Sequence, residues 1–156
     1  MSLFKSLGEK IRGSLNDRVD SLFFSENRDQ LMQACRQSSL KLLDEEGFFT
    51  PVMVFVEMNV LSKNAIRLWQ EGKLPALRPL IRLSDNMIER CLNVMKDTAD
   101  QHSLVVRYMP FYDPRFAADD PERPILPFTL SHDQAMERAL SMAVSRPRKP
   151  KNRSSL

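Results

Sequence analysis

Apolar residues recur every three or four positions along most of the chain, and this spacing predicts a mainly helical protein. The pattern begins in residues 2–24, which we expect to form an amphipathic N-terminal helix. Residues 27–45 continue it and stop before Gly47, a residue suited to the left-handed turn that ends many helices. A wide apolar face over about residues 80–101 predicts a further long helix.

Residues 49–71 predict two short helices. The segment contains five consecutive apolar residues, three of them valine, which would also suit a strand. Thr50 followed by Pro51 favours a helix, because Thr caps the first turn and Pro is tolerated at its first position. Ser62 opens a second helix in the same way, and Gly72 ends it. We therefore expect a short buried helix, a turn and a second helix.

The C-terminal third predicts a small β-hairpin followed by a helix. Residues 104–109 are rich in β-branched side chains and predict a strand, and residues 125–130 are its expected partner. Between them, residues 110–124 are expected to form an acidic loop, because the prolines of this segment favour turns over a helix or a strand. Residues 131–134 have the Ser-x-x-Gln spacing of a capping box, which opens a final helix over about residues 132–144.

Together these elements predict one mainly α (α+β) domain over residues 1–145, with five to six helices and a small hairpin. A length of 156 residues suits a single domain. The net charge of +3 arises from residues 146–156, which we expect to be a disordered basic tail, since residues 1–145 carry a net negative charge. The bases of this tail are Arg146, Arg148, Lys149, Lys151 and Arg153. The tail fits a phosphate-binding arm, a peptide that docks on an acidic partner, or a solubilising terminus.

Several enzyme classes are disfavoured by the glycine content. The chain has only four glycines, and no two of them form a phosphate-binding loop or a nucleophile elbow. His102 and His132 have no second ligand at metal-binding spacing, and the acids of residues 113–122 lack the EF-hand pattern. We therefore expect no metal, no cofactor and no catalytic residues.

The two cysteines, Cys35 and Cys91, occupy mostly apolar helical positions and are predicted to be buried, reduced thiols. The N-terminus lacks the continuous apolar core of a secretory signal, and no apolar run is long enough to span a membrane. These features predict a cytoplasmic protein without a membrane span.

Residues 50–75 resemble the helix-turn-helix of the excisionase and MerR-type DNA-binding families. The residues that match those families are Arg67, Trp69, Glu71, Gly72, Lys73, Leu74 and Pro75. The resemblance implies that the second helix enters the major groove of DNA. Its expected base-reading residues are Lys63, Asn64, Arg67 and Gln70, and its expected backbone contacts are Lys73, Arg78 and Arg82. The alternative is that the two helices only pack in the core.

A broader resemblance runs from Phe49 to Leu80 and includes Trp69-x-x-Gly72-x-Leu74-Pro75. This stretch is similar to part of an uncharacterised family of bacterial proteins, in which a Pro-Val segment precedes a Trp-x-x-Gly-x-Val-Pro stretch and a long helix. The late strand and closing helix of that family are echoed by residues 123–126 and 135–144. The resemblance implies a single bacterial domain and no particular activity.

These patterns favour a non-enzymatic binding protein that contacts nucleic acid through residues 50–82 and the basic tail. The alternative is a protein-interaction or self-assembly module, and an enzyme of unknown class is the third possibility. The interface of the alternative is the N-terminal apolar stripe, Phe4, Leu7, Ile11, Leu15 and Leu22.

An aromatic group near Arg107 and Arg115 is suited either to stacking on bases or to anchoring its loop; it comprises Tyr108, Phe111, Tyr112 and Phe116.

Overall fold

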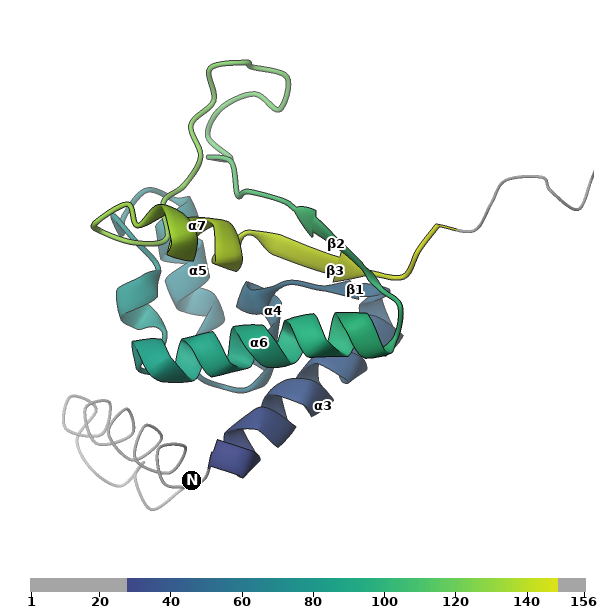
Figure 1. Ribbon diagram of the computed structural model, residues 1–156. Coiled ribbons are helices and arrows are strands. Elements are labelled where there is room, and N and C mark those ends of the chain that lie inside the picture. The colour runs from purple at the N-terminus through teal and green to yellow at the C-terminus, as the bar shows by residue number, and fades with distance from the viewer. Residues whose placement is uncertain (1–27, 149–156) are drawn as a thin grey trace, which may run out of the picture.

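The computed structural model describes residues 28–148, which form a layer of helices beneath a small β-sheet (Figure 1). The elements are α3 (Arg28–Glu46), β1 (Phe48–Phe49), α4 (Pro51–Glu57), α5 (Lys63–Gln70), the 3₁₀ helix η1 (Arg78–Leu80), α6 (Asp85–Gln101), β2 (Val105–Tyr108), α7 (Gln134–Leu140) and β3 (Met142–Ser145). Five α-helices and a three-stranded sheet confirm the predicted mainly α class. The predicted N-terminal helix lies outside the described residues.

The sheet has the order β1-β3-β2, and both pairings are antiparallel. Val144 of β3 lies opposite Phe49 of β1 and opposite Val106 of β2. Because side chains alternate between the faces of a strand, these three residues share one face with Met142 and Tyr108. Phe49 and Val144 are fully buried on that face, whereas Val106 is 48% exposed. The face is therefore covered at β1 and β3 but open at β2.

Local start and stop signals are confirmed in α4 and α5. The Thr50 hydroxyl accepts a hydrogen bond from the Met53 amide at 3.2 Å, and the Ser62 hydroxyl accepts one from the Ala65 amide at 3.0 Å. Gly47 and Gly72 have φ values of 84° and 79°, in the left-handed region that glycine adopts without steric cost. These signals were readable in the sequence because a cap satisfies backbone groups within its own turn.

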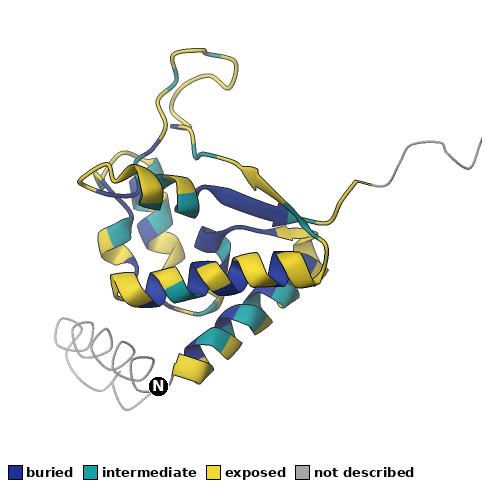
Figure 2. Cartoon of the chain, viewed as in Figure 1, coloured by how far each residue is buried: buried dark blue, intermediate teal, exposed yellow. Residues whose placement is uncertain are grey.

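The main core lies between α3, α4, α6 and the sheet. Figure 2 shows α6 buried along one side and exposed along the other, as its amphipathic pattern requires. Leu31 and Cys35 of α3 and Ile88 and Met95 of α6 are all fully buried. A second cluster joins α5 to the loop before α7, where Trp69, Phe111 and Phe128 pack with ring centroids 5.0–5.7 Å apart.

The predicted hairpin between residues 104–109 and 125–130 is wrong in its second strand. The first strand forms as β2, but its partner is β3, a segment predicted as the end of the last helix. Only the pair Tyr112 and Ile125 forms an isolated bridge near the expected hairpin. Met142 and Ala143 have good helical propensity, but β3 is paired on both edges, and these tertiary contacts override that propensity.

Two predicted helix starts are also corrected. The long helix begins at Asp85, not at residue 80, because Ser84 caps it by accepting a hydrogen bond from the Met87 amide at 3.2 Å. The last helix is capped by Asp133, which accepts from the Met136 amide at 3.1 Å, so Ser131 is not its cap. Both corrections shift a helix start to a residue whose side chain satisfies the first free amides.

Cys35 and Cys91 are buried and form no disulfide with each other, as predicted. The Cys35 thiol donates to the Cys91 carbonyl at 3.4 Å, which links α3 to α6. Hydrogen bonding with Cys35 and then burial raise the pKa of the Cys91 thiol above its ordinary value. The reactive thiolate is therefore disfavoured at this position.

This environment predicts slow thiol chemistry in the native protein. A chromogenic disulfide reagent should react with both cysteines about a hundredfold more slowly in buffer than in denaturant, because reaction requires local opening. The release of chromophore over time measures this rate. Equal rates in buffer and in denaturant would contradict the burial of the two thiols.

Candidate functional site

The residues predicted to read bases lie on α5 as expected. Lys63, Asn64 and Arg67 are exposed, and Gln70 is half-buried. Arg67 is held within its own helix, since it donates to Asn64 at 2.6 Å and to Glu71 at 3.0 Å. These contacts organise one exposed face of α5.

Glu71 also pairs with Lys73 at 3.2 Å, so one carboxylate serves two of the predicted nucleic-acid contacts. Hydrogen bonds from Arg67 and Lys73 lower the pKa of the Glu71 carboxyl, which keeps its negative charge over a wider pH range. A phosphate group that approached Arg67 or Lys73 would have to compete with this carboxylate. The charge available at the end of α5 is smaller than the sequence suggested.

Arg78 and Arg82 are used inside the fold. The Arg78 guanidinium donates to the carbonyls of Ile81 and Leu83 and to the carboxylate of Asp85, the last at 2.6 Å. Its side chain is only 20% exposed. Arg82 donates to the carbonyl of Asn59. Both arginines hold the connection between α5 and α6, a role that their place in the sequence did not reveal.

The predicted basic tail begins with a residue that contacts the folded body. Arg146 donates to the Leu43 carbonyl at 3.0 Å and lies 3.8 Å from the Asp44 carboxylate. Arg148 is exposed. The remaining predicted tail contacts, Lys149, Lys151 and Arg153, lie outside the described residues, as does the predicted N-terminal interface.

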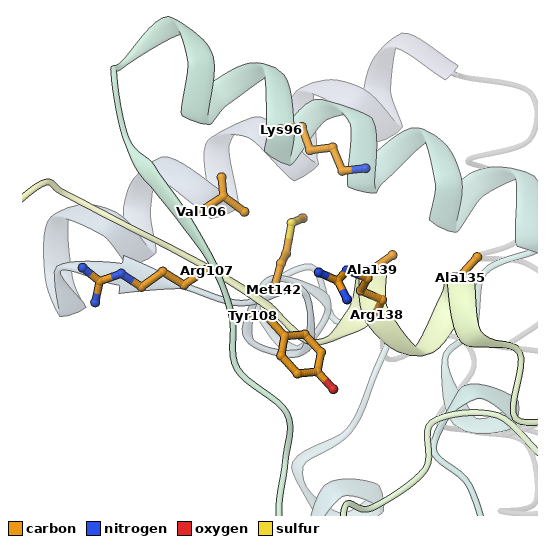
Figure 3. Close-up of a pocket in the computed structure, with 8 residues that line it drawn as sticks. All are labelled: Lys96, Val106, Arg107, Tyr108, Ala135, Arg138, Ala139 and Met142. Carbon is orange, nitrogen blue, oxygen red and sulfur yellow. The ribbon is translucent and has the colours of Figure 1, made fainter.

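A groove of about 470 Å³ lies between α6, α7 and the open face of β2 (Figure 3). Its apolar part is formed by Val106, Met142, Ala135 and Ala139, together with the ring of Tyr108. Lys96 from α6 and Arg138 from α7 point toward the same space, whereas Arg107 extends along the opposite side of β2. The Arg138 guanidinium lies 5.3 Å from the centre of the Tyr108 ring, within cation–π distance.

The three basic residues that line this groove have no carboxylate partner in the described part of the chain, whereas six of the other basic residues do. Six ion pairs engage basic residues elsewhere: Lys41–Glu57, Arg67–Glu71, Lys73–Glu71, Arg78–Asp85, Arg115–Asp113 and Arg146–Asp44. Lys96, Arg107 and Arg138 form no ion pair with any described residue. Basic and acidic residues are equal in number over residues 28–148, so this local excess arises from their arrangement.

The groove continues into a second hollow of about 350 Å³ along α6 and α7, and the two share Lys96, Ala135 and Ala139. Glu89 and Asp133 line the second hollow. The surface between the two helices therefore has a basic end beside β2 and an acidic end beyond it. A ligand that occupies both hollows would be oriented by this polarity.

The predicted aromatic group is divided by the structure. Phe111 packs in the core against Trp69 and Phe128, which anchors the loop as one interpretation expected. Tyr108 and Phe116 are 50% and 44% exposed. The Asp113 carboxylate, in the loop predicted to be acidic, is buried and accepts two hydrogen bonds from the Arg115 guanidinium at 2.7 and 2.9 Å.

The groove could not be recognised in the sequence because it is formed by three separated segments. Lys96 and Arg138 occupy ordinary polar positions of helices, and nothing local marks them. Their convergence depends on the pairing of β2 with β3, which was not predicted. Arg107 and Tyr108 were the only members noted, as part of the aromatic group.

Comparisons of the chain with models of protein families, with curated proteins and with solved structures find no match. Both family resemblances therefore stay predictions. Over residues 28–148, no three His, Cys, Asp or Glu side chains come together as a metal site would require. None of the described helices combines the length and the apolar character needed to cross a membrane.

Proposed function

We propose that this chain is a non-enzymatic binding protein that docks an acidic partner protein in the groove between α6, α7 and β2. The observation that carries the proposal is the convergence of Lys96 and Arg138 from two different helices on one apolar space. Neither side chain has a carboxylate partner among residues 28–148. This is a protein-interaction function at a different surface from the one predicted at the N-terminus.

Electrostatics support an anionic ligand. Two cations that point into one space repel each other, and a carboxylate between them adds two attractions that offset this repulsion. The apolar walls of the groove lower the local dielectric and strengthen these attractions. An acidic side chain is therefore the group best suited to the basic end of the groove.

The apolar surface supports a protein partner rather than an isolated ion. Val106 and Tyr108 are about half exposed, at 48% and 50%, and Met109 beyond them is 52% exposed. Tyrosine, methionine and arginine are enriched at protein interfaces, where they bury large contact areas. The same residues would contact apolar side chains that flank the acidic group of a partner.

Nucleic-acid binding through α5 is the second candidate function. It is favoured by the exposed face that Lys63, Asn64 and Arg67 share on α5, a capped helix that follows α4 in the chain. Binding there would use this face together with the basic residues of 146–156. The competing contacts of Glu71 with Arg67 and Lys73 place this candidate second.

One experiment separates the two candidates. A fluorescein-labelled peptide of alternating Glu and Val residues and a labelled random DNA duplex would each be titrated with the full-length protein, with fluorescence anisotropy as the readout. Replacing Lys96 and Arg138 by Glu should weaken peptide binding about tenfold or more, because attraction becomes repulsion at two positions. Lys63→Glu with Arg67→Glu is the matched control, since it makes the same charge change on another exposed helix and should leave peptide binding unchanged.

Which variant loses binding, and of which probe, decides between the groove and the α5 surface. Binding of the acidic peptide that resists the groove substitutions, or equal binding of a Lys-Val peptide, would exclude the groove as an acidic-partner site. Duplex binding that is lost only in the Lys63 and Arg67 variant would instead support the α5 surface. Circular dichroism of each variant checks that the helical content is retained.

A further inference from the structure

The outer edge of β2 is open along the groove. The order β1-β3-β2 places β2 at one end of the sheet. Among the described strands, β3 alone pairs with it. The loop of residues 110–124 leaves the end of β2 and projects away from the sheet (Figure 1). An uncovered edge presents backbone donors and acceptors to any chain that can extend beside it.

The hydrogen-bond pattern identifies which residues face this edge. The Met109 amide donates to the Ser141 carbonyl at 2.6 Å, and this pair continues the register of β2 and β3. Hydrogen-bonded pairs alternate along antiparallel strands, so Val105 and Arg107 also face β3. The amide and carbonyl groups of Val106 and Tyr108 therefore point to the open edge.

We infer that an extended acidic segment of a partner protein adds to β2 as a fourth strand, held by the backbone groups of Val106 and Tyr108. The inference rests on the proposed function and names its mode of binding. Because Val106 and Tyr108 also direct their side chains to the groove, residues paired with them share that face. Acidic side chains at alternate positions of the added strand then point toward Lys96 and Arg138.

Charge also disfavours a second copy of this chain as the occupant. Two β2 strands paired antiparallel through all the edge groups of Val106 and Tyr108 would place Arg107 opposite Arg107 of the other copy. That position is a non-hydrogen-bonded pair, in which side chains come closest. Like charges directly opposite each other destabilise a sheet. An acidic or neutral strand avoids this repulsion.

The test uses the unaltered full-length protein and chemically altered probes. The Glu-Val peptide would be prepared with N-methyl groups on all Glu amides or on all Val amides, two sets that face opposite edges of an extended strand. One set should weaken binding about tenfold or more, because it removes the bonds to β2, and the other should bind like the unmodified peptide. The two methylated peptides have the same composition, so each is the control for the other.

Backbone amide exchange provides a second measurement on the protein. In the free protein the Val106 and Tyr108 amides should exchange faster than the Arg107 amide, which is bonded to β3. On addition of the unmodified peptide, exchange of the Val106 and Tyr108 amides should slow about tenfold or more. Val106→Pro removes one edge amide without removing a bond to β3 and should weaken peptide binding.

The possible failures are distinguishable. Absence of binding by the unmodified peptide would overturn the proposed function itself. Equal loss for both methylated peptides, with binding still sensitive to Lys96 and Arg138, would overturn strand addition and leave the groove as an acidic-partner site. A dimer in sedimentation that Val106→Pro dissociates would assign the edge to a second copy and would also overturn strand addition.

Discussion

Replacement of Trp69 by Ala should lower the free energy of unfolding by about 3–5 kcal/mol. The side chain is fully buried, and its ring packs against Phe128 at 5.0 Å and Phe111 at 5.5 Å between centroids. Its indole nitrogen donates to the Pro127 carbonyl at 2.8 Å. The substitution removes the largest buried side chain of this cluster and leaves a carbonyl without its partner, so the cavity and hydrogen-bond costs add.

The measurement is urea unfolding followed by circular dichroism, since Trp69 is the only tryptophan and its fluorescence is lost with it. Trp69→Phe retains an aromatic ring and should cost less, about 1–3 kcal/mol. Phe116→Ala is the matched control because Phe116 is 44% exposed, and it should change stability by about 0.5 kcal/mol or less. Similar losses for Trp69→Ala and Phe116→Ala would show that the aromatic cluster does not stabilise the fold.

Replacement of Glu137 by Ala should lower the free energy of unfolding by about 3 kcal/mol. The Glu137 carboxylate accepts hydrogen bonds from the amides of Phe128 and Thr129, both at 2.8 Å, and from the Thr129 hydroxyl at 2.7 Å. Phe128 and Thr129 are buried, so their amides would lose an acceptor where water has little access. An unsatisfied buried donor costs more than the bond itself contributes.

Glu137→Gln provides the graded comparison. It retains one carbonyl oxygen that can accept these bonds but loses the charge, so it should destabilise by about half as much. Glu89→Ala on the exposed side of α6 is the matched control and should have an effect of about 0.5 kcal/mol or less. A Glu137→Ala variant as stable as Glu89→Ala would show that this carboxylate does not hold the segment before α7.

The helices that sequence analysis predicted correctly are those with complete local signals. Thr50 and Ser62 cap α4 and α5 through bonds to amides three residues away, and Gly47 ends α3 with a positive φ. Each of these interactions lies within one helical turn, so the residues concerned are close in sequence. The Ser84 and Asp85 start of α6 has the same local chemistry and was readable, but the apolar spacing of Leu80 and Leu83 obscured it.

The errors lie where distant segments decide the structure. Met142 and Ala143 have helical propensity, but they form part of the central strand because β1 and β2 pair with both edges of β3. The basic residues between α5 and α6 illustrate the same limit for the site. Arg78 was predicted to contact the DNA backbone, yet its guanidinium donates to the Asp85 carboxylate and to two carbonyls that its own sequence position does not identify.

Local patterns in the chain were enough to predict the helical class, the caps and turns around α4 and α5, and the burial of both cysteines. These depend on apolar periodicity and on contacts within a turn, which are properties of adjacent residues. By contrast, the meeting of Lys96, Arg138 and Tyr108 at one groove and the open edge of β2 arise from tertiary contacts. Those features depend on strand register and helix packing, because residues far apart in the chain become neighbours only when the sheet and its helices assemble.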